Sequence, residues 1–158
     1  MTPTNAHMTS NLFFRDAEQQ DLPAIAALLA DDELGAARDG IQHLAAYAQA
    51  LEAIQAQRGN ALVVAVLDAE VVGMLQLTLI PGLSRGGMLR AQIESVRVSG
   101  KHRRRRIGHA LIEHAIALAR DARCGLVQLT TDKQRSDALR FYERLGFKAS
   151  HEGMKLAL

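Results

Sequence analysis

The stretch HRRRRIGHALIEHA, residues 102–115, places four arginines directly before an isoleucine, a glycine and an amphipathic helix. A helix N-terminus carries partial positive charge and favours acidic side chains, so these arginines need an explanation. The first four amides of a helix have no intrahelical partner, and Gly108 has no Cβ to keep a ligand away from the main chain. Amides, helix dipole and guanidinium groups together predict a phosphate site. The alternative is a solvated basic loop before an ordinary helix.

The basic charge of the chain is local. The sequence has 19 Lys and Arg against 17 Asp and Glu, and five of the basic residues lie in Lys101–Arg106, which leaves 14 against 17 elsewhere. A nucleic-acid binder usually spreads a basic face more widely and adds base-reading side chains, which are absent near this run. A nucleic-acid binding module is therefore the weaker alternative.

Length and composition are typical of one globular domain. The 158 residues are 48% hydrophobic and 23% charged, which suits a single core over residues 11–158, whereas residues 1–10 are polar and patternless and predict a disordered tail. No run of about 18 apolar residues and no secretory signal is present, so we expect no membrane contact and a cytoplasmic location. The single cysteine excludes an internal disulfide.

Hydrophobic periodicity outward from the arginine run predicts an α/β (α+β) fold in the order βααβββαβαβ. Apolar residues at helical spacing predict helices, and runs rich in β-branched residues predict strands joined first by hairpins and later by helix crossovers. This order indicates a mixed, mostly antiparallel central sheet flanked by helices. The predicted later elements are a strand over 88–98, a helix over 107–122, a strand over 125–131, a helix over 136–147 and a last strand over 152–158.

Two stretches carry a family resemblance. IESVRVSGKHRRRRIGHALIEHA (93–115) and TTDKQRSDALRFYERLGF (130–147) resemble the GNAT superfamily of acetyl-CoA-dependent N-acetyltransferases. The phosphate loop of that family reads Gln or Arg, two residues, Gly, one residue, then Gly or Ala. Arg103 fills the first position and Gly108 the last, but Arg106 replaces the middle glycine. The resemblance extends over nearly the whole chain.

The resemblance implies acetyl-CoA as co-substrate and no metal. The amides of Arg104 to His109 would hold the pyrophosphate, and the main chain at Val96 and Val98 would bind the pantetheine arm like an added strand. An asparagine that contacts the cofactor in the family is replaced by Arg135, so that contact is not carried over. The implied cofactor-binding residues are Val96, Arg97, Val98, Arg103, Arg104, Arg105, Arg106, Ile107, Gly108 and His109.

Acetyl transfer to an amine needs a base and an acid. Deprotonating an alkylammonium at pH 7 costs roughly 4.6 kcal/mol, and a departing thiolate benefits from a proton donor. Glu94, which shares a strand and a side-chain parity with Val96 and Val98, matches a family glutamate and is the candidate base. Tyr142 matches the tyrosine to which the family assigns the acid role. The alternatives are a structural carboxylate and a core aromatic.

The acceptor is a primary amine, of a small molecule or a peptide, that the sequence does not identify. Asp31, Asp32, Glu33 and Asp39 would attract a cationic amine, although such acidic runs are commonly solvated connections. The histidines show no metal-binding spacing. The family resemblance also suggests a homodimer. A non-catalytic acyl-CoA sensor that kept the fold and lost transfer is the remaining alternative.

Overall fold

Five strands form one sheet in the computed structural model, which describes residues 11–158. The strands lie in chain order, and β5 pairs in parallel with β4 while all other pairs are antiparallel. The predicted mixed, mostly antiparallel sheet is therefore confirmed, and the predicted tail over 1–10 lies outside the described residues. The strands are β1 (Leu12–Asp16), β2 (Asn60–Leu67), β3 (Glu70–Ile80), β4 (Arg90–Val98) and β5 (Leu126–Leu129).

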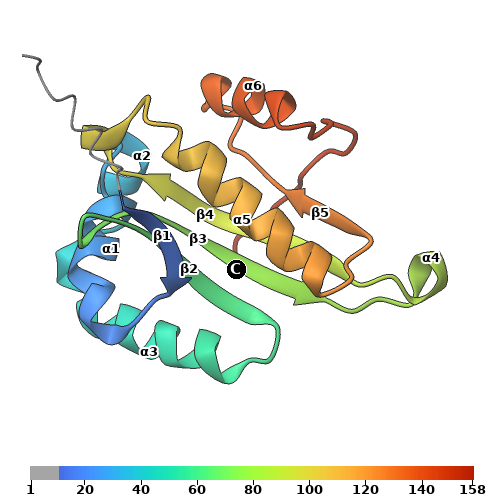
Figure 1. Ribbon diagram of the computed structural model, residues 1–158, viewed down its shortest axis with the longest axis horizontal. Coiled ribbons are helices and arrows are strands. Elements are labelled where there is room, and N and C mark those ends of the chain that lie inside the picture. The colour runs from blue at the N-terminus through green and yellow to red at the C-terminus, as the bar shows by residue number, and fades with distance from the viewer. Residues whose placement is uncertain (1–10) are drawn as a thin grey trace, which may run out of the picture.

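Helices cover both faces of the sheet (Figure 1). One face packs against α1 and α3, and the other packs against α5. Two short helices, α2 and α4, lie in connections between the longer elements. The helices are α1 (Leu22–Leu29), α2 (Glu33–Ala36), α3 (Leu44–Ala56), α4 (Ser84–Gly87), α5 (Ile107–Asp121) and α6 (Ser136–Arg144), with single 3-10 turns η1 (Gln19–Asp21), η2 (Ile41–His43) and η3 (Gly100–His102).

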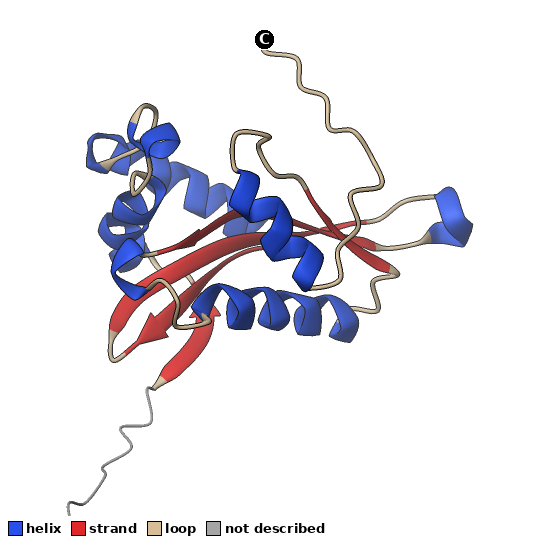
Figure 2. Cartoon of the chain, turned by 90° about the horizontal axis from the view of Figure 1, so that it is seen from above, coloured by secondary structure: helices blue, strands red, loops and turns tan. Residues whose placement is uncertain are grey.

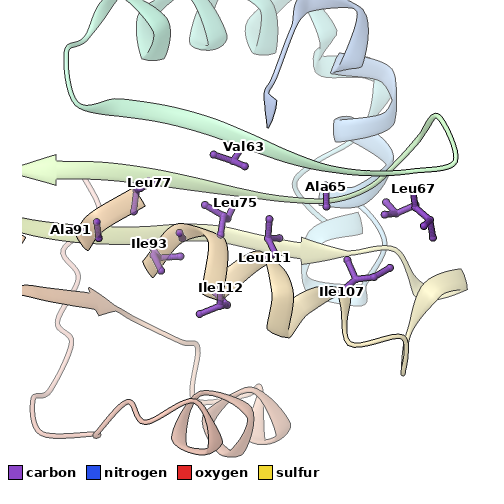
Figure 3. Close-up of a cluster of buried hydrophobic side chains, with 13 residues drawn as sticks. Val63, Ala65, Leu67, Leu75, Leu77, Ala91, Ile93, Ile107, Leu111 and Ile112 are labelled. Carbon is purple, nitrogen blue, oxygen red and sulfur yellow. The ribbon is translucent and has the colours of Figure 1, made fainter. Parts of the chain in front are cut away.

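The core on the α5 face fixes where the arginine run lies. Ile107, Leu111, Ala115 and Ala119 recur every four residues along α5 and are all buried. They pack against inward-facing side chains of β2, β3 and β4, such as Ile93 (Figure 3). Burying a side chain of this size contributes roughly 1.5–3 kcal/mol. Because Ile107 is the first residue of α5, this packing anchors the helix N-terminus beside the sheet.

The opposite face has its own core. Leu22, Ile25 and Leu28 of α1 and Leu51 of α3 pack against apolar side chains of β2 and β3. The middle of β2 is buried on both faces, as its uninterrupted run of apolar residues predicts. Ile41, which continues the helical spacing of Leu44, Ala48 and Leu51 towards the N-terminus, is 61% exposed in η2 and lies outside α3. The helix begins three residues later, at Leu44.

The predicted last strand over 152–158 is wrong. This segment has no strand structure, and the side chains of Met154, Leu156 and Leu158 are exposed. The chain after α6 leads away from the sheet (Figure 2). A strand needs a neighbour to accept its backbone hydrogen bonds, and in the described part of the chain nothing pairs with these residues. Alternation of apolar residues alone is therefore not enough to form a strand.

Candidate functional site

The sheet splits at the end of β4. β5 pairs with β4 only from Arg90 to Ile93, so residues 94–98 continue without a neighbouring strand on that side. A free strand edge presents backbone groups to which an extended ligand can add. This edge contains Val96 and Val98, the residues predicted to bind a pantetheine arm along their main chain.

A bulge at Ser95 changes which way the side chains of β4 point. Ser95 has φ of 54°, and the register between β3 and β4 shifts between Met74 and Gln76. As a result Val96 and Val98 pack into the α5-side core, whereas Glu94 lies opposite Gln76, on the α1 side. The predicted shared parity of Glu94 with the two valines is wrong, because the extra residue of a bulge interrupts the alternation of a strand.

The loop before α5 has a backbone that could bind an anion. Arg104 and Arg106 both adopt left-handed conformations, with φ of 67° and 58°. Successive turns of this kind direct backbone N–H groups into a concavity. Arg106 thus adopts a conformation that usually favours glycine. Its guanidinium is exposed, like those of the three arginines before it.

The first turn of α5 carries no cap. Arg106 is the N-cap residue without a side-chain hydrogen bond, and no acidic residue lies in the first turn. The first helical bond runs from the Ala110 amide to the Arg106 carbonyl at 3.0 Å. The amides of Ile107, Gly108 and His109 therefore remain without helical partners and are available to an anion.

Tyr142 lies on α6, half buried beside the split. Its ring makes edge contacts with Phe141 and Phe147 at centroid distances of 5.1 Å and 5.9 Å. Burial raises the pKa of its hydroxyl, and the positive charges of Arg97 and Arg135 oppose this rise. The phenol is therefore protonated at neutral pH and lies within the field of two arginines. Tyr142 packs against the α5-side core, and Glu94 is on the other face of β4.

Asp31 and Asp32, two of the acidic residues predicted near the acceptor, already have partners. The Asp31 carboxylate accepts from the Gly100 amide at 2.7 Å, and Asp32 accepts from the Gly35 amide at 2.6 Å and pairs with Arg135 at 2.7 Å. Burial alone would raise the pKa of Asp32, but these two donors lower it. Glu33 is exposed. The role of Asp31, Asp32 and Glu33 in binding an amine stays a prediction.

Arg135 is a residue that the sequence reasoning missed as part of a site. It is the N-cap residue of α6, and the pKa values of Arg97 and Tyr142 both respond to its charge. The family resemblance indicated only that Arg135 replaces an asparagine that contacts the cofactor. Its proximity to Arg97 depends on how α6 packs beside β4, which no local spacing reveals.

A small cavity of about 110 Å³ lies on the α1 side of the sheet. Its lining includes Leu22 of α1, Tyr47 of α3, and Gln76 and Ser95 at the bulge. Among residues 11–158, no three His, Cys, Asp or Glu side chains gather as metal ligands. No helix in the same range is both long and apolar enough to cross a membrane.

A mostly antiparallel sheet that splits beside a left-handed loop and an uncapped helix defines the structural class of this protein. Residues 22–147 match the model of the Acetyltransferase (GNAT) family, and the chain belongs to that family. A crystal structure of a transcriptional regulator from Bacillus halodurans C-125 shares the fold with a TM-score of 0.89 and 46% identity, covering 93% of this chain and 99% of that one.

Two curated relatives match over part of their length. The glucosamine 6-phosphate N-acetyltransferase of Trypanosoma brucei brucei is 35% identical over 88 residues, which is 56% of this chain and 58% of the relative. The aminoalkylphosphonate N-acetyltransferase of Salmonella typhimurium is 37% identical over 87 residues, which is 55% of this chain and 56% of the relative. The matched region therefore spans just over half of each relative.

Proposed function

We propose that this protein transfers the acetyl group of acetyl-CoA to a primary amine. The observation that carries the proposal is the left-handed loop and uncapped α5 N-terminus beside the unpaired edge of β4, in a chain of a family that uses acetyl-CoA. The free amides of residues 107–109 and the loop arginines bind the pyrophosphate. The edge at Val96 and Val98 binds the pantetheine arm, which directs the thioester into the split.

Glu94 and Tyr142 serve the two sides of the reaction. The amine nitrogen attacks the thioester carbonyl carbon, and Glu94 takes the proton that the nitrogen loses, directly or through a water. The C–S bond then breaks, and the Tyr142 hydroxyl donates its proton to the sulfur, which leaves as the thiol of CoA. Their positions on opposite sides of β4 support this division, because the nucleophile and the leaving group occupy different sides of the reacting carbon.

The acceptor is proposed to be a small amine. The two curated relatives are named for an amino sugar phosphate and an aminoalkylphosphonate, which are small molecules with an amino group. A peptide amine remains the alternative. The cytoplasmic location and the homodimer stay predictions.

Thermal unfolding with and without acetyl-CoA tests the proposal, because it needs no acceptor. Ligand at 100 times its Kd adds roughly 2.7 kcal/mol, which is about 5 to 11 °C for a domain of this size. We expect this shift to shrink when Arg104 and Arg105 are changed to Ala. A screen of small amines for release of free thiol then tests transfer.

The two measurements separate the alternatives. Stabilisation by acetyl-CoA with acetylation of an amine supports the enzyme. Stabilisation without thiol release from any amine supports the acyl-CoA sensor instead. If millimolar acetyl-CoA does not stabilise the protein and no amine releases thiol, the proposal is refuted. The arginine run is then a solvated or docking loop.

A further inference from the structure

Arg97 is a partly buried positive charge without an ion pair. Its Nη1 donates to the Val96 carbonyl at 2.9 Å, and its Nε is shielded from solvent without any partner. In the described part of the chain no carboxylate lies within salt-bridge distance of it. Burial lowers the pKa of Arg97, and the positive charge of Arg135 lowers it further. Removing a charge from water costs several kcal/mol unless a counter-charge is close.

Arg135 provides a second unsatisfied donor beside it. Its Nη1 is paired with Asp32 at 2.7 Å, but its Nη2 is shielded from solvent and has no partner. Asp32 also caps α2 by accepting from the Gly35 amide, so its two oxygens are already in use. Among residues 11–158, Asp32 is the only carboxylate paired with either guanidinium, and neither of its oxygens is free for Arg97.

The charges around Arg97 do not balance. The groups that act on its pKa are Arg135, Arg38, Asp32 and Asp39, so with Arg97 itself the cluster has three positive and two negative charges, a net of +1. Arg38 pairs with Asp39 at 3.5 Å and Arg135 with Asp32, which leaves Arg97 as the uncompensated charge. The arginines of residues 103–106 do not contribute to this cluster.

The unpaired charge lies at the reacting end of the site. Arg97 and Arg135 both act on the pKa of Tyr142, the proposed acid. Arg97 also lies opposite Met74, on the α1 side of β4, as does Glu94, the proposed base, opposite Gln76. A group bound between these residues would therefore belong to the acceptor or to the reacting atoms themselves.

We propose that Arg97 and Arg135 bind an oxyanion carried by the acceptor, so that the substrate is an amine with a phosphate, phosphonate or carboxylate a few bonds from its nitrogen. This inference rests on the proposed function. A guanidinium binds such groups through parallel N–H donors, and the oxyanion supplies the negative charge that the cluster lacks. Glu94 lies on the same side of β4, so the amine of a bound acceptor is placed near the base.

The test compares matched amines within each variant. We would measure kcat/KM for 3-aminopropylphosphonate, 4-aminobutanoate and the neutral 4-aminobutan-1-ol. We expect the wild type to favour an anionic amine over the neutral one by tenfold to a hundredfold, about the effect of one charge-assisted hydrogen bond. The phosphonate and carboxylate arms show which oxyanion fits better.

Substitution of Arg97 should abolish this preference. Arg97→Gln is expected to bring the ratio of anionic to neutral amine close to one through a higher KM for the anionic amine, and Arg97→Lys to retain part of it. The ratio within one variant is unaffected by a change in folding or cofactor binding. Arg90→Gln, at the far end of β4, is the matched control and should keep the wild-type ratio. A wild-type ratio near one overturns the proposal, because the protein would then not recognise the oxyanion. An equal loss of kcat/KM for all amines in Arg97→Gln also overturns it, because Arg97 would then act on a group common to all reactions.

A binding measurement separates this proposal from the proposed function. Methylphosphonate is titrated into the protein saturated with CoA, which occupies the phosphate loop. We expect binding that weakens at least tenfold in Arg97→Gln and is unchanged in Arg90→Gln. If this binding is observed but no amine releases thiol, the transfer reaction is refuted and the oxyanion site is still supported. Absence of methylphosphonate binding, or equal binding by Arg97→Gln, refutes the site whatever the activity.

Discussion

At the scale of single residues, Arg106 is held in a backbone conformation that suits glycine. With φ of 58° and ψ of 16° it is left-handed, which costs a residue with a Cβ about 1–2 kcal/mol. Arg106→Gly removes this strain but adds freedom to the unfolded chain, so we expect a net gain of about 0.5–1 kcal/mol in the free energy of unfolding. Chemical denaturation of wild type and Arg106→Gly measures this difference in the free energy of unfolding.

The neighbouring Arg105 provides the control for that prediction. Arg105 is exposed but does not have positive φ, so Arg105→Gly removes the same charge without relieving strain and should lower stability. Equal effects of the two changes would show that charge repulsion, not backbone strain, sets the result.

Tyr142 is predicted to matter through its hydroxyl. Tyr142→Phe keeps the ring and its edge contacts, so unfolding should change little, while kcat should fall about a hundredfold if the hydroxyl is the general acid. Because burial raises the pKa of the hydroxyl above its ordinary value, the acid stays protonated through neutral pH, and activity is lost only at strongly alkaline pH. A pH profile of kcat checks this, and the Phe variant should lack that alkaline limb. A kcat within twofold of wild type would make Tyr142 a core aromatic only.

At the scale of elements, most of the fold was predictable because the apolar faces of α1, α3 and α5 pack against the sheet. The helix over 107–121 and the strands of the hairpins follow from periodicity alone. The bulge was not predictable, because Ser95 is not a glycine and nothing else in its sequence context marks it. The strand over 152–158 failed because alternation does not supply a neighbouring strand.

The candidate site, like the fold, was only partly predictable from the sequence. The loop before α5 could be singled out as a candidate phosphate site from the sequence, because its glycine and arginines are contiguous. The pair formed by Arg97 and Arg135 was not, because it depends on α6 packing beside the split sheet.

The junction of β1 with α1 depends on one ion pair. Arg15 contacts both oxygens of Asp21 at 2.6 Å and 2.9 Å, and the Glu18 amide donates to the same carboxylate at 2.8 Å. Asp21 is only 6% exposed. Asp21→Asn leaves Arg15 without its counter-charge, so we expect a loss of about 3 kcal/mol at pH 7, measured by denaturant unfolding. Asp137→Asn, in an exposed pair with Arg140, is the control and should cost less than about 0.5 kcal/mol.

The same pair gives a pH dependence with a definite sign. The hydrogen bond from Arg15 lowers the pKa of Asp21 in the folded protein below its unfolded value of about 3.9. The stabilisation is therefore complete above about pH 4 and is lost as pH falls through the lower folded value. Wild type and Asp21→Asn should converge in stability as the solution is acidified. A constant difference down to pH 2 would contradict the assignment to this carboxylate.

At the scale of the whole molecule, the excess of basic over acidic residues is concentrated in one loop. Lys101–Arg106 holds five of the 19 basic residues, and the remaining 14 are outnumbered by 17 acidic ones. The loop side chains are exposed, so salt screens their attraction strongly: the Debye length falls from about 30 Å at 0.01 M to about 3 Å at 1 M. We expect the Kd for acetyl-CoA, measured by titration calorimetry, to rise about tenfold between 0.02 M and 0.5 M NaCl.

Two comparisons assign that salt dependence to the loop. The double change Arg104→Gln and Arg105→Gln should flatten it, whereas changing the exposed Arg58 and Arg120 to Gln should leave it in place. If Kd does not change with salt, the arginines are solvated side chains and the phosphates are held by the uncapped amides of α5 alone. In that case the double variant would bind acetyl-CoA as tightly as wild type, because backbone donors do not depend on the side chains of the loop that presents them.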